Sequence, residues 1–131
     1  MSRTSTPPPT TLHYSRSKRE LHVAFEDGVE GTLPAEFLRV LSPSAEVRGH
    51  GPGQEVLQAG KALVGISAIH PVGHYAVQLD FDDGHDSGIY SWELLRDFVL
   101  RKTVLWQDYL QRLTASGLSR DPDIQVLTFQ P

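Results

Sequence analysis

Hydrophobic residues alternate with polar ones in two segments of the chain, and each segment predicts a half-buried β-strand. Residues 21–25 read LHVAF and residues 75–81 read YAVQLDF, so an apolar side chain stands at every second position of both. This period is typical of a strand with one face against a core and the other in solvent. Turns that read EDG and DDG follow, which predicts two hairpins with return strands over 29–32 and 86–90.

Helical patterns follow both predicted hairpins. A short helix is expected over 34–39, because proline is tolerated in the first turn of a helix, and Ser42-Pro43 ends it. After the second hairpin, Ser91 is expected to cap a helix that runs to about residue 100, where the pair Arg101-Lys102 marks a break. Another helix places apolar residues of 106–113 on one face and ends at Gly117. The apolar run 63–69 predicts a buried strand, with a turn at 70–73.

The two halves of the chain repeat one pattern. Residues 25–28 match 81–84 and Leu33 matches Ile89 at an offset of 56, whereas Glu36, Leu38 and Arg39 match Glu93, Leu95 and Arg96 at an offset of 57. Two interpretations are open. Turns and helix starts converge in composition, or the chain holds a duplicated ββα unit whose halves share one sheet. Both predict an α+β fold with a mainly antiparallel sheet and C-terminal helices.

The two ends of the chain differ in composition from its middle. Serine, threonine and proline supply nine of residues 1–11, which predicts a disordered tail because nothing there offsets the entropy of ordering. One domain is expected over 12–118 and a flexible tail over 119–131. The short apolar run in 124–127 leaves open whether that second tail docks on the domain.

Composition excludes several classes of function. The 131 residues include no cysteine, so thiolate catalysis, disulfides and thiolate-bound metal centres have no ligands in this chain. A formal net charge of −4 argues against a nucleic-acid partner. No apolar run approaches the length of a membrane span or a signal peptide, so we expect a cytoplasmic protein without a membrane partner.

Two long motifs carry a resemblance to a known family. Residues 33–50 read LPAEFLRVLSPSAEVRGH, and residues 69–77 and 81–92 read IHPVGHYAV and FDDGHDSGIYSW. Both resemble the gamma-butyrobetaine hydroxylase-like N-terminal domain family, which is catalogued as a bacterial domain of unknown function. The likeness covers about residues 12–118.

The resemblance implies an appendage and no hydroxylase activity. In the hydroxylase, a separate jelly-roll domain binds iron and 2-oxoglutarate, and this chain has no His-x-Asp or His-x-Glu that would supply half of its facial triad. The hydroxylase appendage holds a structural zinc through three cysteines and a histidine, which correspond to Ser42, Ser44, Val47 and His85 here. The family domain also resembles a segment appended to some P-loop iron–sulfur cluster carriers, which implies a partner in iron or iron–sulfur metabolism.

Histidines and aspartates of the second hairpin are the candidates for a metal site. His85, Asp82 and Asp83 would suit iron or zinc, and the alternative is a solvated acidic turn. His70 and His74 flank the turn predicted at 70–73, where they would either share a metal with His85 or an aspartate, or bind solvent. Because several carboxylates surround the turn, we expect a pKa of His85 above that of a free histidine.

No set of catalytic residues is complete in the sequence. His85, Asp86 and Ser87 are the residue types of a hydrolase triad, but neighbours in a strand point to opposite faces and cannot act on one another. We therefore expect a small protein without enzymatic activity that binds a protein partner. The sequence assigns no cofactor to it. The alternative is an iron- or zinc-binding protein that uses His85 with Asp82 or Asp83.

Overall fold

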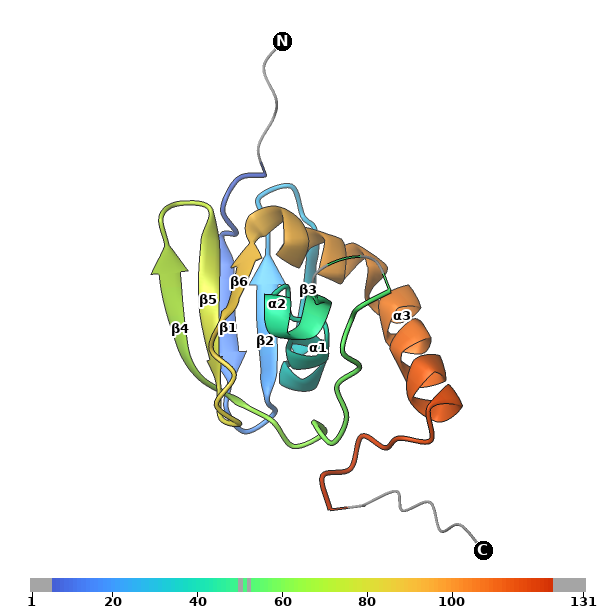
Figure 1. The fold of residues 1–131 in the computed structure, drawn as a ribbon. Helices are drawn as coiled ribbons and strands as arrows, with labels where there is room; N and C mark the ends of the chain where they lie inside the picture. The colour runs from blue at the N-terminus through green and yellow to red at the C-terminus, as the bar shows by residue number, and fades with distance from the viewer. Residues whose placement is uncertain (1–5, 50, 52, 124–131) are drawn as a thin grey trace, which may run out of the picture.

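The computed structural model describes residues 6–49, 51 and 53–123, and it contains two three-stranded antiparallel sheets (Figure 1). Each sheet is followed along the chain by a helix. The elements are, in order, β1 (Thr11–Ser15), β2 (Glu20–Ala24), β3 (Glu30–Pro34), α1 (Ala35–Val40), α2 (Ala45–Arg48), β4 (Ile66–Val72), β5 (Ala76–Phe81), β6 (Gly88–Ser91) and α3 (Trp92–Ala115). The α+β class and the antiparallel pairing predicted from the sequence are confirmed.

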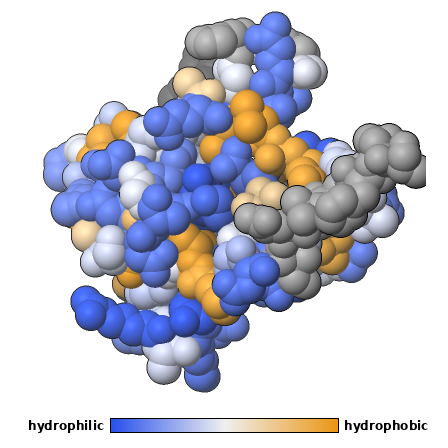
Figure 2. All heavy atoms as spheres, turned by 60° about the horizontal axis from the view of Figure 1, so that its bottom comes forward, coloured by the Kyte–Doolittle hydropathy of each residue, from blue (hydrophilic) through white to orange (hydrophobic). Residues whose placement is uncertain are grey.

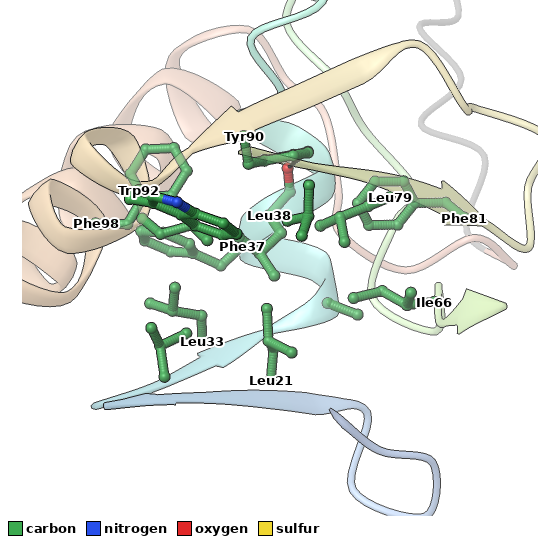
Figure 3. Close-up of a cluster of buried hydrophobic side chains, with 14 of the residues drawn as sticks. Leu21, Leu33, Phe37, Leu38, Ile66, Leu79, Phe81, Tyr90, Trp92 and Phe98 are labelled. Atoms are coloured by element: carbon green, nitrogen blue, oxygen red, sulfur yellow. Dashed lines mark hydrogen bonds between the residues drawn. The ribbon is translucent and has the colours of Figure 1, made fainter. Parts of the chain in front are cut away.

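The core lies where the inner faces of the two sheets meet α1 and α3. β2 and β5 are the central strands of their sheets, and their alternating apolar side chains point inward, as the period-2 pattern predicts. Figure 3 shows side chains of both sheets directed toward one another and toward those of α1. Leu21, Leu33, Leu38, Leu79 and Tyr90 have no exposed surface. Burial of these side chains supplies the main driving force for folding.

The prediction that the two halves share one sheet is wrong. Among the described residues, strands pair only with neighbours of their own half, in the orders β1-β2-β3 and β4-β5-β6, because short turns favour local antiparallel pairing. The halves meet through side chains instead. The sequence reasoning also missed β1, whose Thr11 lies within the predicted tail. The strand predicted over 63–69 continues to Val72 as β4, so His70 to Val72 belong to a strand and not to a turn. β4 is an edge strand, which tolerates Pro71.

The repeated pattern corresponds to a repeated structure. Gly28 has φ +92° and Gly84 has φ +93°, and the amide of each donates to the carbonyl of the phenylalanine three residues earlier, at 3.1 and 3.0 Å. Asp27 Oδ1 accepts from the amide of Val29 at 3.3 Å, and Asp83 Oδ1 accepts from that of His85 at 3.2 Å. Each half also forms three antiparallel strands followed by a helix, so the repeat extends from the sequence pattern to the fold, with one strand more than the predicted ββα unit.

One correspondence in the predicted repeat is wrong. Leu33 matches Tyr90 and not Ile89, because Leu33 and Tyr90 are both fully buried whereas Ile89 is 49% exposed. The change of offset from 56 to 57 residues thus occurs before β6 begins.

The two halves are joined by reciprocal ion pairs. Arg39 of α1 donates from Nε to Asp83 in the second hairpin at 2.8 Å. Arg96 of α3, its counterpart, donates from Nη2 to Asp27 in the first hairpin at 2.5 Å. Each helix therefore holds the turn of the other half.

We predict that Gly28→Val and Gly84→Val destabilise the protein alike. A Cβ at either position would meet no atom within 4 Å, so the cost comes from the positive φ alone, about 1–2 kcal/mol. Gly51→Val is the control, since the same space surrounds Gly51 without a positive φ. Chemical denaturation of the three variants measures this. A loss of stability at Gly84 without one at Gly28 would contradict the equivalence of the two turns.

The long helix α3 begins and bends where the sequence predicts. Ser91 Oγ accepts from the amide of Leu94 at 3.1 Å, which caps the helix, and Arg101 has the non-helical angles φ −111° and ψ 17°. Gly117, at φ +69°, follows its end. Among the helices in the described part of the chain, none has the length and apolar character needed to cross a bilayer.

Candidate functional site

His85 stands at the centre of a buried polar cluster between the second hairpin and the connection from α1 to α2. Its side chain is 3% exposed although it belongs to a turn. The imidazole Nε2 lies 2.8 Å from Ser42 Oγ, and Nδ1 lies 2.9 Å from Glu46 Oε1. The imidazole thus joins segments that are more than 35 residues apart in the sequence.

The surroundings of His85 favour a neutral imidazole with its proton on Nδ1. The carboxylate of Glu46, 2.9 Å from Nδ1, can only accept, so Nδ1 carries a proton. In the neutral ring Nε2 then accepts from the hydroxyl of Ser42, whose oxygen also accepts from the amide of Ser44 at 3.2 Å. Burial and the positive charge of Arg39 lower the pKa of His85, against the opposing effect of Glu46.

The expectation that the pKa of His85 is raised is therefore wrong. The imidazole turns away from the wet acidic turn and into the protein, where desolvation outweighs the nearby carboxylates.

Two further serines extend the cluster to the protein surface. Ser44 Oγ lies 2.6 Å from Ser87 Oγ, and Ser87 Oγ donates to Glu46 Oε1 at 3.2 Å. Ser44 Oγ also accepts from the amide of Glu46 and so caps α2. We call Ser42, Ser44, Glu46, His85 and Ser87 the His85 cluster. Glu46, whose side chain is 68% exposed, is its contact with solvent.

Ser42, His85 and Glu46 have the order of contacts found in a serine-hydrolase triad. A hydroxyl lies on Nε2 and a carboxylate on Nδ1, which is the arrangement that activates a serine for nucleophilic attack. However, Ser42 has no exposed surface, so its Oγ is closed to a substrate. Asp86 and Ser87, which the sequence places beside His85, do not complete a triad, because the partners of the imidazole come from the α1–α2 connection instead.

The structural zinc implied by the family resemblance does not fit the residues present. Ligands of one tetrahedral zinc stand about 3.5 Å apart, whereas a 2.8 Å hydrogen bond joins Ser42 Oγ directly to His85 Nε2. Ser42 and Ser44 offer hydroxyls, and Val47, buried at 5% exposure, offers no donor at all. In this chain, hydrogen bonds join the α1–α2 connection to the second hairpin, which are the two segments that the zinc would join.

Asp82 and Asp83 are directed to partners other than the imidazole of His85. Asp82 Oδ2 accepts from the amide of Gly65 at 3.0 Å. Asp83 Oδ2 accepts from Arg39 and from Lys61, at 2.8 and 2.5 Å. Although burial raises the pKa of Asp83, hydrogen bonds from Lys61, the amide of His85 and Arg39 bring it down to about 2.

The residues predicted as metal ligands thus do not converge in this structure. Within residues 6–49, 51 and 53–123, no group of three or more histidine, aspartate or glutamate side chains is arranged to hold a metal ion. Metal binding through His85, Asp82 and Asp83 stays a prediction.

The other two candidate histidines lie apart from His85. His70 is in β4, where its Nε2 lies 2.8 Å from Asp80 Oδ2 on the exposed face of the sheet. His74 is in the β4–β5 turn, and its carbonyl accepts from Trp92 Nε1 at 2.7 Å. The β4–β5 turn and the β5–β6 turn are at opposite ends of β5, so the structure does not bring His74 to His85.

Sequence reasoning missed three residues around the His85 cluster. Glu46 gave no signal, because α2 has only four residues and no apolar period. Tyr90 is buried and donates from its hydroxyl to the carbonyl of Leu38 at 2.6 Å, and burial raises its pKa. Arg39 is 7% exposed with a buried, unpartnered Nη1. The match of Arg39 to Arg96 in the repeat was the signal in the sequence that Arg39 forms an ion pair with a hairpin aspartate.

Proteins of known structure that are similar to this chain include two solved by NMR and one by crystallography. A protein solved by NMR is 44% identical over 97% of this chain and 100% of its own, with a TM-score of 0.80. A second NMR structure is 46% identical over 100% of this chain and 98% of its own, with a TM-score of 0.77. A crystal structure from Acidithiobacillus ferrooxidans, of the DUF971 family and of unknown function, is 37% identical over 70% and 91%, with a TM-score of 0.58. No curated protein matches the chain.

A family model gives the assignment directly. The model described as gamma-butyrobetaine hydroxylase-like, N-terminal, matches residues 12–96. This range contains both motifs of the sequence analysis, the second of which ends at Trp92. Those residues also include every member of the His85 cluster. The chain belongs to the gamma-butyrobetaine hydroxylase-like N-terminal family.

Proposed function

We propose that this chain is a non-catalytic accessory module that acts by binding a protein partner. The observation that supports the proposal most directly is on α3. Leu100 and Val104, on either side of the kink at Arg101, are 63% and 65% exposed. Large apolar side chains that are exposed close together are typical of a surface that another protein covers.

The exposed pair lies away from the core side of its helix. Phe98 and Tyr109 are buried at 5% and 1% exposure, whereas Leu100 and Val104 face solvent. The kink at Arg101 falls between the two members of the pair. The His85 cluster supports the non-catalytic part of the proposal, because Ser42 is fully buried and its hydroxyl is closed to a substrate.

The partner that we propose is an iron–sulfur cluster carrier of the P-loop class. Its support is the resemblance of this family to a segment appended to some of those carriers, so it is an analogy between families. A partner of that class would place the chain in iron or iron–sulfur metabolism in the cytoplasm.

We predict that Leu100→Asp together with Val104→Asp abolishes partner binding without unfolding the protein. Two carboxylates would be desolvated at the interface, whereas both positions face solvent in the free chain. The measurement is titration of the purified chain with the P-loop carrier of the same cells, by calorimetry. Gln107→Asp with Gln111→Asp adds the same charges to exposed positions at the same spacing and should bind like the wild type. Equal affinity of both double variants would contradict the proposed surface, and no binding by the wild type would contradict the proposed partner.

Metal binding is the second candidate function, and one observation favours it. The lowered pKa of His85 keeps its imidazole neutral, which is the state that a metal requires. The decisive measurement is the iron and zinc content of protein purified without a histidine tag. Metal at one atom per chain that is lost in His85→Ala would establish this function. Folded wild-type protein that takes up neither added iron nor added zinc would contradict it.

A further inference from the structure

A positively charged turn joins β1 to β2, although the protein as a whole has a net charge of −4. Three of the four residues in the turn are cationic, namely Arg16, Lys18 and Arg19, and all three are exposed. None of them forms an ion pair within residues 6–49, 51 and 53–123, whereas five other arginines there each bind a carboxylate. The turn therefore keeps an uncompensated positive charge.

A hollow of about 280 Å³ opens beside this turn, and we call it the turn hollow. Arg16 and Arg19 line it together with Tyr14 of β1, residues 65–67 where β4 begins, and Asp82 of the second hairpin. Figure 2 turns the lower end of Figure 1, where β1 joins β2, toward the viewer and shows many hydrophilic side chains on this face. The charged turn thus borders a concave surface.

The backbone fixes Arg19 at the wall of the turn hollow. Among the described residues, Arg19 is the one other than glycine with a positive φ, +54°. Residues held in such uncommon conformations are frequent at ligand-binding sites. The amide of Ala35 donates to the carbonyl of Arg19 at 2.8 Å, which holds the turn in place. The side-chain stem lies beside Gly65, where an added Cβ would stand 3.9 Å from Arg19 Cδ.

The turn hollow offers hydrogen-bond donors to an anion. Tyr14 Oη accepts from the amide of Ile66 at 2.9 Å, and its own hydrogen has no acceptor in the described part of the chain. The two arginines add donors whose forked geometry matches a carboxylate. Asp82 is the one carboxylate in the wall, and its Oδ2 accepts from the amide of Gly65 at 3.0 Å. Positive charge therefore exceeds negative charge around the hollow.

Two edge strands border the turn hollow. β1 is outermost in the order β1-β2-β3, and β4 is outermost in the order β4-β5-β6. Tyr14 and Ile66, which line the hollow, belong to these two strands. An edge strand has a row of backbone groups without a neighbouring strand, so it binds extended segments of other chains. The edges favour an extended ligand, and the arginines favour a negatively charged one.

The described ends of the chain leave the turn hollow open. None of its lining residues comes from 6–10 or 116–123. The amides of Gly60 and Ala62 donate to the carbonyls of Ser119 and Arg120, at 2.8 and 2.9 Å. These two residues of the predicted flexible tail are therefore held against the domain. Residues 1–5 and 124–131, the outer parts of both predicted tails, lie outside the described residues.

We infer that the β1–β2 turn and the turn hollow bind an extended acidic segment of a partner protein, whose carboxylates pair with Arg16 and Arg19. A nucleic acid would require cations along several phosphates and aromatic rings on which bases stack, whereas the cations here are confined to one turn. No lining residue belongs to α3, so this surface is separate from Leu100 and Val104 and its test does not depend on theirs.

A fluorescent hexaglutamate peptide tests this inference. The full-length protein should raise the anisotropy of the peptide, with an affinity that falls as salt is added. Arg16→Gln together with Arg19→Gln should weaken binding by about tenfold or more, because two charge-assisted contacts are lost. Absence of binding by the wild type would overturn the inference.

A second pair of arginines supplies the matched control. Arg48 and Arg112 line another hollow, of about 340 Å³, but Glu55 and Asp108 line it as well. Arg48→Gln with Arg112→Gln removes the same net charge from equally exposed positions and should bind hexaglutamate like the wild type. Equal losses in the two double variants would show attraction by the overall charge and overturn the assigned site.

Two other probes distinguish the kind of ligand. Diglutamate should bind about tenfold more weakly than hexaglutamate, because it cannot run along the hollow. Equal affinity of the two peptides would identify a site for a small anion and overturn the extended segment. A short single-stranded oligothymidylate should bind more weakly than hexaglutamate. Tighter binding of the oligonucleotide that is lost in Arg16→Gln with Arg19→Gln would identify a nucleic-acid site and overturn the acidic protein segment.

Discussion

Replacing Ser42, Ser44 and Val47 together by cysteine is expected to give a protein that binds zinc at one ion per chain. The family resemblance places the cysteine ligands of the hydroxylase appendage at these three positions, and Ser42 Oγ already lies 2.8 Å from Nε2 of the imidazole that would be the fourth ligand. A site of three thiolates and one histidine is a common structural zinc site. Structural zinc contributes roughly 10–16 kcal/mol of apparent binding free energy at pH 7. The triple variant should therefore melt at a higher temperature with zinc than after treatment with a chelator.

Two measurements check this result. Elemental analysis gives the zinc content, and cobalt substitution gives the absorption bands of a tetrahedral thiolate site. The same three cysteines in a His85→Ala background should bind zinc less tightly, and Ser42→Ala, Ser44→Ala and Val47→Ala together should bind none. A triple-cysteine protein that folds and takes up no zinc would show that the hydrogen-bonded connection does not stand where the family resemblance places the metal.

His85→Ala should destabilise the wild-type protein by about 2–3 kcal/mol. The substitution removes two hydrogen bonds and leaves the hydroxyl of Ser42 as a buried donor without its acceptor. For a domain of this size the loss corresponds to a melting temperature lower by roughly 10 °C. His70→Ala is the control, because that side chain is 53% exposed and its loss should cost less than about 0.5 kcal/mol. Equal melting temperatures of the two variants would contradict a structural role of the cluster.

The pH dependence of stability gives the same residue a second signature. The pKa of His85 is lowered on folding, so the unfolded chain binds more protons and stability falls as pH drops below about 6.5. The pKa of Asp83 is lowered from 3.8 to about 2, so its contribution is lost separately, as pH falls below 3.8. His85→Ala should abolish the first decline and keep the second. Denaturation curves between pH 7 and pH 3 distinguish the two, and an unchanged first decline would assign it to another group.

The strands and helices that follow the hairpins could be predicted because their signals are local. The alternation in residues 21–25 and 75–81, the glycines of the two turns and the cap at Ser91 each depend on a few neighbouring residues. β1 escaped prediction because it contributes only Leu12 and Tyr14, both half-buried, to the core. The separation into two sheets also escaped, since a repeat in the sequence does not state whether its halves pair through backbone or side chains.

The candidate site was predicted only in part because its contacts are long-range. His85 was singled out from its hairpin, but its partners Ser42 and Glu46 lie about 40 residues earlier in the sequence. The burial that lowers its pKa arises only when the α1–α2 connection covers the turn. The carboxylates next to His85 in the sequence bind other partners. Asp82 accepts from the amide of Gly65, and Asp83 accepts from Arg39 and Lys61.

The reciprocal pairs of Arg39 with Asp83 and of Arg96 with Asp27 follow the rule of an isologous subunit interface. In such an interface a residue of one subunit contacts a residue of the other, and the equivalent residues make the same contact in return. Here both sides of the interface belong to one polypeptide. Each hairpin aspartate binds an arginine of the other half, although Asp83 also accepts from Lys61, which precedes β4. A chain of half this length would therefore need a second copy of itself to supply that arginine.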